Sequence, residues 1–262
     1  MKHADKRFKD VQKSFYDVRY SIGSRALNKL SNLLMLSYDK RLFGIVKERF
    51  CGAIVHRMLD VGAGQGSDAV LLSEAFPEIV AIDLSKNALL TARALFRLTK
   101  NQDKIAVVQA DAENLPFKEG AYDAVYSRDV LHHVSNSVLS VKEMKRVTKE
   151  KGTIVAIEAN ALNPQMIVIG LLYFSVDHGV FRNTFSFLWD IFSQADLHSI
   201  RITSTECFPR HIFFEYRSPL NRFFLAHSSL TLRLLSTIED SWQKISVLSK
   251  FSNYLIVSAS KT

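Results

Sequence analysis

The sequence predicts an α/β fold in which a mostly parallel sheet is covered by helices on both faces. Short apolar runs alternate with stretches of helical period along most of the chain. The runs are apolar throughout instead of at alternate positions, which is typical of strands buried on both faces. Gly and Pro number only 10 and 5 of 262 residues, which argues against a many-turned all-β design. The length favours one domain with sizeable additions.

The elements follow in order from this pattern. Apolar residues three or four apart predict two amphipathic helices between residues 25 and 50. Strands are expected at 58–61, 79–82, 105–108, 124–126, 153–157, 200–207 and 254–259. Helices are expected at 67–75, 86–98, 137–148 and 185–195, with a helical insertion at about 208–250. These elements divide a single domain into an N-terminal helical part at 1–50, a core at 51–160 and a C-terminal part at 161–262.

The positive charge of the chain belongs to its two ends. The net charge is +8, with 12 Lys and Arg against 5 Asp and Glu in residues 1–50 and 8 against 4 in residues 201–262. Two cysteines suggest neither a disulfide framework nor a zinc site. The first residues lack the apolar stretch of a signal peptide, and the uncharged apolar run 166–176 is about half the length that spans a bilayer. We therefore expect a cytoplasmic protein.

The most informative motif follows the first expected strand and reads Asp-Val-Gly-Ala-Gly-Gln-Gly over residues 60–66. Glycines there let the backbone turn sharply and approach a ligand, while the next helix offers free N–H groups. Asp83 closes the second expected strand, where a carboxylate can accept hydrogen bonds from ribose hydroxyls. A dinucleotide fingerprint would place its third glycine at 67, where the chain has Ser67. The alternative is a purely structural tight turn.

This pattern resembles motif I of the class I S-adenosylmethionine-dependent methyltransferases. Asp111-Ala112, after the third expected strand, is similar to the adenine-binding segment of that family. Residues 117–134 are similar to the strand-four segment of its small-molecule subgroup, the methyltransferase type 11-like proteins. The resemblance covers about residues 50–160, and more loosely 184–207 and 252–260, but not the first 50 residues or 208–250. It implies a Rossmann-like sheet of seven mostly parallel strands with an antiparallel last strand. This sequence adds N-terminal helices and a helical insertion between strands six and seven.

The resemblance also implies S-adenosylmethionine as the cofactor, with no metal. Asp60 would help hold the ammonium group of the methionine portion, Asp83 would bind the ribose, and Asp111 would accept from the adenine amine. As alternatives, Asp60 could cap the turn and Asp83 could cap the next helix, although Ser85 is the better cap candidate. The expected cofactor contacts are Asp60, Gly62, Ala63, Gly64, Asp83, Leu84, Asp111, Ala112, Ser127 and Arg128, together with Tyr16 and Tyr20 from an N-terminal lid.

Candidate catalytic residues lie where the fourth and fifth expected strands end. A hydroxyl acceptor must lose a proton, and a neutral imidazole of His132 or His133 could remove it near pH 7. At least one of these histidines could instead pack or cap the following helix. Glu158 could hold or deprotonate an acceptor, but a solvated strand end is an equally good interpretation.

A small-molecule acceptor is the preferred substrate, with O-methylation slightly favoured. RNA is an alternative because of the positive charge, but the segment at Ser127 lacks the Asn/Asp-Pro-Pro-aromatic turn of base-methylating relatives. A non-catalytic binding or assembly module on the same fold is a third hypothesis. The apolar and arginine-rich stretch 210–240 could make a peripheral membrane contact. Both a monomer and a homodimer fit the sequence.

Overall fold

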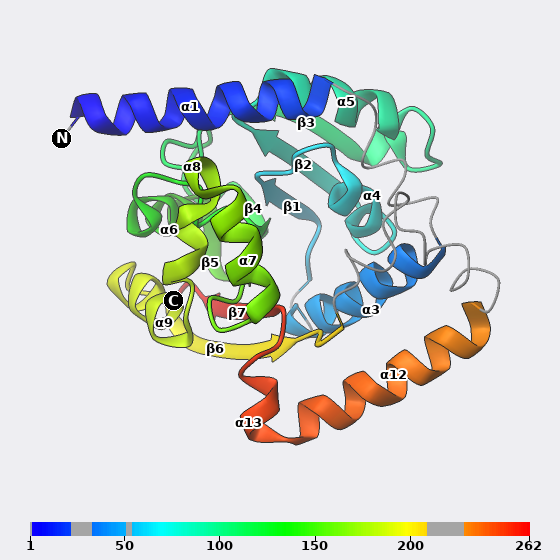
Figure 1. The fold of residues 1–262 in the computed structure, drawn as a ribbon. Helices are drawn as coiled ribbons and strands as arrows, with labels where there is room; N and C mark the ends of the chain where they lie inside the picture. Colours follow the sequence, from blue (N-terminus) through cyan, green and yellow to red (C-terminus); the bar gives the residue numbers. More distant parts are fainter. Residues whose placement is uncertain (1, 22–32, 51–53, 209–227) are drawn as a thin grey trace.

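The computed structural model describes residues 2–21, 33–50, 54–208 and 228–262 (Figure 1). Its centre is a seven-stranded sheet of order β3-β2-β1-β4-β5-β7-β6. The strands are β1 (Arg57–Val61), β2 (Glu78–Asp83), β3 (Ile105–Gln109), β4 (Tyr122–Arg128), β5 (Thr148–Ala159), β6 (His198–Thr205) and β7 (Tyr254–Ser260). β1 to β5 pair in parallel, whereas β7 runs antiparallel to both β5 and β6. The seven expected strands and the antiparallel last strand are confirmed.

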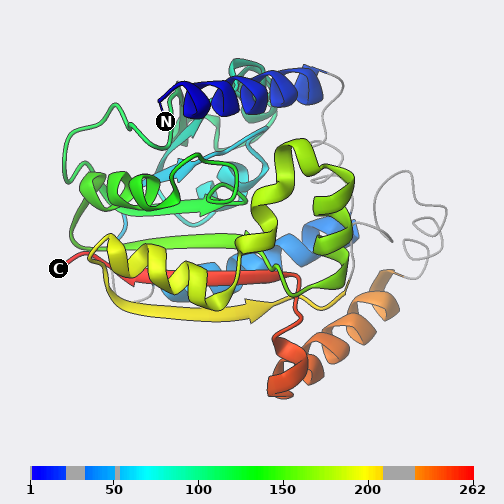
Figure 2. The same ribbon diagram turned by 60° about the vertical axis from the view of Figure 1, so that its left-hand side comes forward.

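Helices cover both faces of the sheet, as Figure 2 shows for α9 in front and α3 behind. One core joins α3 (Leu33–Arg49), α4 (Ser67–Ser73) and α5 (Lys86–Phe96) to the sheet. The other core joins α6 (Ser137–Val147) and α9 (Phe185–Gln194) to the opposite face. Side chains of neighbouring strand residues enter opposite cores, so Met58 lies in the first and Leu59 in the second. The continuously apolar strands follow from this double burial.

Side-chain caps fix where several of these helices begin. Ser85 accepts the backbone N–H of Ala88 at the start of α5, as expected. Asn136 accepts from Leu139 at the start of α6. These caps satisfy N–H groups that have no partner within the first helical turn.

Helix α1 (Lys2–Ser21) lies across the carboxyl ends of the central strands, with α5 beside it (Figure 1). Of the two helices expected between residues 25 and 50, the described part contains one, α3, and residues 22–32 lie outside it. Among the described residues, no helix is both long enough and apolar enough to cross a bilayer.

The segment between β5 and α9 contains elements that the sequence did not predict. They are α7 (Pro164–Leu172), α8 (Phe174–Asp177) and the 3-10 helix η2 (His178–Arg182). α7 has clear start signals, because Asn163 accepts from two backbone N–H groups and Pro164 takes the first helical position. The expected helical insertion appears as α12 (Ser228–Lys244) and α13 (Ser246–Ser249), while residues 209–227 lie outside the described part.

Candidate active site

The glycine-rich turn after β1 is shaped by a close contact with the loop after β4. Gly62 has a φ of +73°, and a Cβ built on it would lie 2.2 Å from Cγ2 of Val130. Both features favour glycine at position 62, since residues with a Cβ disfavour positive φ and two unbonded carbon atoms cannot approach so closely. Ala63 donates its N–H to the carbonyl of Ile82 at 2.8 Å, which ties the turn to the end of β2. The turn therefore touches both neighbouring strand ends.

Asp83, at the end of β2, holds the same turn through its carboxylate. Its Oδ2 accepts the N–H of Gly64 at 2.8 Å and its Oδ1 accepts the N–H of Ser85 at 2.8 Å. Burial raises the pKa of Asp83, while these backbone donors oppose the shift. Next to it, the carbonyl of Leu84 accepts from the side-chain amide of Gln109 on β3. Each carboxylate oxygen of Asp83 has one bonded donor and keeps a further acceptor position.

Asp111 lies beyond β3 and pairs with helix α1. Its Oδ2 is 2.6 Å from Nζ of Lys9, and its Oδ1 accepts the backbone N–H of Glu113 at 2.9 Å. The Lys9 ammonium also pairs with the buried carboxylate of Glu113. Burial opposes the charged form of Lys9, but the two carboxylates outweigh it and raise its pKa. Ala112 packs at the edge of the core beside Asp111.

Helix α1 makes two further contacts along the same edge of the sheet. Asp17 accepts from the Ser85 hydroxyl and its backbone carbonyl accepts from the Asn87 side chain, so it binds the start of α5. Tyr16 places its hydroxyl 2.9 Å from Nε2 of His133, with the two rings edge to face at 5.3 Å. Tyr20 falls within α1, but its side chain lies outside the described residues. One helix thus bridges the ends of β2, β3 and β4.

Three polar side chains on β1 and β4 lie deeper in the protein. Asp60 is 1% exposed, and its Oδ2 has no hydrogen-bond partner among the described residues. Burial and the nearby charges of Asp68 and Asp83 raise the pKa of Asp60 well above its ordinary value. The hydroxyl of Ser127 is likewise buried without a partner in the described part of the chain. Arg128 is held on the α3 and α4 side of the sheet.

The Arg128 guanidinium lies 3.3 Å from Asp39 on α3 and 3.4 Å from Asp68 on α4. It also stacks over the ring of Tyr254, at 5.4 Å from the centroid. The two carboxylates balance the positive charge of the Arg128 guanidinium within the protein. Arg128 therefore acts as a structural tie between two helices and the sheet, whereas the sequence alone had suggested a place in the cofactor site.

Glu158, at the end of β5, organises the loop that carries the two histidines. It is fully buried, so the interpretation as a solvated strand end was wrong. Its Oε1 accepts the backbone N–H groups of Val130 and Leu131, at 3.0 and 2.7 Å. Its Oε2 contacts Nδ1 of His132 at 2.5 Å and accepts from the Asn183 side chain at 3.0 Å. Both oxygens of Glu158 are thus engaged with the loop after β4, the His132 ring and Asn183.

The Glu158 contact determines which nitrogen of His132 is basic. In the neutral imidazole, Nδ1 carries the proton donated to the carboxylate, so the lone pair is on Nε2. Burial opposes a charge on His132, but the carboxylates of Glu158, Asp129 and Asp177 raise its pKa above the ordinary value of a histidine. A buried histidine paired with a carboxylate has the arrangement that general bases use.

Replacing Glu158 by Gln should lower the pKa of His132. The substitution keeps the volume of the side chain but removes the charge that stabilises the imidazolium. An NMR titration of the imidazole resonances against pH measures the shift. An unchanged His132 titration would contradict the role assigned to Glu158.

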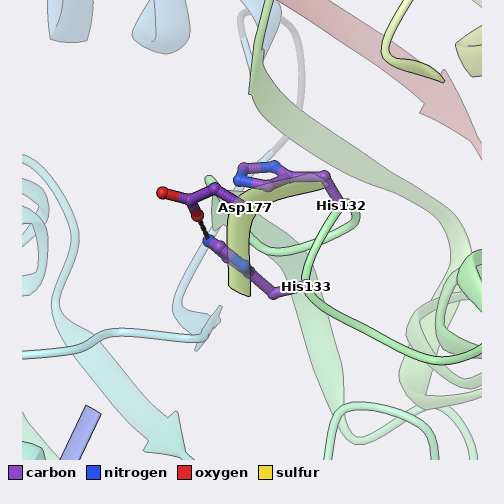
Figure 3. A group of neighbouring side chains, drawn as sticks. All are labelled: His132, His133 and Asp177. Atoms are coloured by element: carbon purple, nitrogen blue, oxygen red, sulfur yellow. Dashed lines mark ion pairs between the residues drawn. The ribbon is translucent and has the colours of Figure 1, made fainter. Parts of the chain in front are cut away.

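His132, His133 and Asp177 form a compact group, which we call the histidine group, at the carboxyl end of the sheet (Figure 3). Each offers one ligand atom, and these atoms lie within 4.8 Å of one another, so the group has the residue types that a divalent cation could use. Asp177 of α8 approaches Nε2 of His133 to 3.4 Å. The same nitrogen meets the Tyr16 hydroxyl. Because protein groups occupy this imidazole nitrogen, we interpret the group as acid–base machinery, and the absence of a metal stays a prediction.

Sequence reasoning missed four residues that the structure adds to this region. Lys9 and Asp17 lie on α1, and Asp177 and Asn183 follow the unpredicted α7. The seven-residue spacing of Lys9 and Tyr16, which places them on one helix face, was a signal in the sequence, but it does not say which strand ends the helix reaches. No local pattern could have paired Asn183 with Glu158, because the contact depends on the fold.

Comparison with known proteins agrees with this geometry. Residues 59–156 match the family model described as a methyltransferase domain, of the methyltransferase 11 type. The uncharacterized methyltransferase YcgJ of Bacillus subtilis is 32% identical over 114 residues, which are 44% of each chain. A demethylmenaquinone methyltransferase of Staphylococcus haemolyticus is 28% identical over 69% of this chain and 84% of its own length. The match thus spans less than half of the Bacillus relative.

The fold is shared with a solved structure of phosphoethanolamine N-methyltransferase 2 from Haemonchus contortus in complex with S-adenosyl-L-methionine. The TM-score is 0.61 at 19% identity, and the likeness covers 85% of this chain and 52% of the other. The sheet order, the glycine turn and the family match agree with the fold of the class I S-adenosylmethionine-dependent methyltransferases, and residues 59–156 match a domain of the methyltransferase 11 type. The cofactor of that class is S-adenosylmethionine.

The residues present fit this cofactor. Asp60 and Ser127 each have a buried oxygen without a partner among the described residues, and such oxygens favour a ligand that donates hydrogen bonds. S-adenosylmethionine has an ammonium group and hydroxyl groups that can donate. The acceptor positions left on Asp83 are at the glycine turn, beside the N–H of Gly64.

Proposed function

We propose that this protein transfers the methyl group of S-adenosylmethionine to a small-molecule acceptor held beside His132 and His133. The observation that carries the proposal is the course of α1. A single helix contacts Asp111 through Lys9, the loop after Asp83 through Asp17, and His133 through Tyr16. The expected cofactor carboxylates and the candidate base therefore lie under the same helix. A reaction between two bound molecules needs this proximity.

We propose the following cofactor roles. Asp83 binds the ribose through its remaining acceptor positions, with Leu84 beside it. Asp111 and the N–H of Ala112 bind the adenine ring, and Asp60 accepts from the ammonium group. Gly62, Ala63 and Gly64 let the backbone pass the methionine portion, and the hydroxyl of Ser127 adds an acceptor at the end of β4. The list of proposed contacts is completed by Tyr16 and Tyr20 of α1.

Bound S-adenosylmethionine supplies a methyl group on a positively charged sulfur. The protein aligns the acceptor with that methyl group and keeps water out, which is its main contribution to a displacement that neutralises charge. For a hydroxyl acceptor, Nε2 of His132 takes the proton while the oxygen gains the methyl group, and S-adenosylhomocysteine leaves. His133 and Tyr16 position the acceptor, and Glu158 keeps His132 in the productive tautomer. We propose α1 as the lid of this site, whereas α3, from the same expected N-terminal part, packs against the sheet.

The relatives support a small-molecule acceptor, since one of them is named a demethylmenaquinone methyltransferase. We favour O-methylation because the buried His132–Glu158 pair provides the base that a hydroxyl acceptor requires. A quinol-like ring hydroxyl is the first acceptor class to test.

The test is methyl transfer from methyl-labelled S-adenosylmethionine to a panel of quinols, simple phenols, glycans and RNA. We expect label in a small molecule, and a loss of roughly 100-fold or more in kcat for His132→Gln, because general-base catalysis contributes about that factor. Binding of S-adenosylmethionine should be retained in this variant. Label in RNA, with an affinity that falls steeply as salt rises, would overturn the small-molecule assignment.

A further inference from the structure

Between Glu158 and Asp177 the chain has no charged residue. The structure folds this stretch into α7 and α8, and Asp177 at the end of α8 pairs with His133 (Figure 3). The inner side of α7 is packed normally. Met166 is buried, and a Cβ on Gly170 would lie 2.5 Å from Val180. An ordinary surface helix would have polar residues on its other side.

The other side of α7 and the start of α8 are instead apolar and exposed. We call this surface the outer α7–α8 face, formed by Val168, Leu171, Leu172, Tyr173 and Phe174. Leu172 is 74% exposed and Phe174 is 59% exposed. Single exposed apolar residues are common on proteins, but consecutive ones of this size mark an interaction surface.

The outer α7–α8 face adjoins the candidate active site. α8 ends at Asp177, which lies 3.4 Å from His133, and α1 packs against α8. A partner on this face would therefore be next to the place proposed for the acceptor. By contrast, α12 also exposes Leu230, Leu234 and Ile238, but both ribbon views show it at the opposite side of the sheet from α1.

Charge identifies the partner that suits this surface. Helix α1, the neighbour of α8, has six Lys and Arg against three Asp in its sequence. A basic helix beside an apolar face with two aromatic residues is the combination that binds an anionic bilayer at its interface. A second copy of the chain would bring two basic helices together, which is unfavourable.

We propose that the outer α7–α8 face docks on an anionic lipid bilayer. There it would give the histidine group access to an acceptor dissolved in the membrane. The docking itself does not depend on the proposed function. Only the idea that the acceptor is dissolved in the membrane rests on the proposed function. This contact lies at 168–174, whereas the sequence had suggested 210–240, of which the structure describes residues 228–240.

The test is co-sedimentation of the full chain with vesicles. One set contains equal amounts of phosphatidylcholine and phosphatidylglycerol, and the other contains phosphatidylcholine alone. The Leu172→Asn/Phe174→Asn variant is compared with a matched control, Leu230→Asn/Leu234→Asn, which removes two exposed leucines from α12. Titration with S-adenosylmethionine checks that each variant is folded and has a working cofactor site.

We expect the wild type and the α12 control to bind the anionic vesicles equally. The α7–α8 variant should bind at least about tenfold more weakly, since it loses two inserting side chains. Vesicle binding that is lost in the α12 control instead, or no binding by any protein, would overturn the proposal. Sedimentation velocity showing a dimer that only the α7–α8 variant dissociates, without vesicle binding, would assign the face to self-association. If the wild type binds vesicles but does not bind S-adenosylmethionine, the proposed function is contradicted while the membrane docking still stands.

Discussion

Replacing Asp83 by alanine is expected to weaken the binding of S-adenosylmethionine by roughly 100-fold. The carboxylate is the proposed partner of two ribose hydroxyls, and hydrogen bonds to a charged group contribute about 1.5 kcal/mol or more each. The same carboxylate holds the N–H groups of Gly64 and Ser85, so its loss also loosens the turn. Titration calorimetry measures the change in Kd.

Two controls separate these effects. Asp83→Asn keeps the size of the side chain and one acceptor oxygen but removes the charge. This variant should retain the fold while losing most of the affinity for S-adenosylmethionine. Asp103→Ala removes an exposed carboxylate from the 3-10 helix η1 (Gln102–Lys104) and should leave the Kd unchanged. A wild-type affinity in Asp83→Ala would show that the ribose is bound elsewhere.

Replacing Gly62 by alanine is expected to destabilise the protein by about 2–4 kcal/mol, because it combines backbone strain at positive φ with overpacking. The added Cβ would meet Val130 at 2.2 Å. Since Val130 belongs to the loop that Glu158 anchors, the histidine group and the cofactor turn should both shift. Thermal unfolding and cofactor titration measure the two consequences.

Gly120 provides a matched control for this substitution. It has a φ of +62°, but the atoms nearest to a Cβ there lie at 3.9 Å or more. Gly120→Ala should therefore show only the cost of the strained φ, about 1–2 kcal/mol, with full cofactor affinity. Adding Val130→Ala to Gly62→Ala should restore part of the stability, since the two changes share one contact. Equal losses for the two glycine variants would exclude the clash as the cause.

Much of the fold could be predicted from the sequence because its strands are short, apolar and separated by helices with clear signals. The runs at 79–82 and 124–126 and the cap at Ser85 are examples where local pattern and tertiary burial agree. α7 was missed because its apolar residues cover the whole helix and show no periodicity. The amphipathic period that reveals a surface helix is lost when its outer side is apolar too.

Part of the candidate site was also predictable from the sequence, and part was not. The glycine turn and Asp83 were predictable, since they occupy fixed positions relative to β1 and β2. The environment of Glu158 was not, because its four partners come from the β4 loop and from Asn183. Whether a carboxylate at a strand end is solvated or buried depends on which loops cover that end. The Lys9–Asp111 pair likewise depends on where α1 packs.

The central claim is that this chain binds S-adenosylmethionine at the turn between β1 and β2. Titration calorimetry of the folded wild-type protein tests it most directly. The structure predicts saturable binding of a single molecule per chain with a micromolar Kd, and a loss of most of this affinity in Asp83→Ala. Folded wild-type protein that shows no binding of S-adenosylmethionine in the titration would contradict the account.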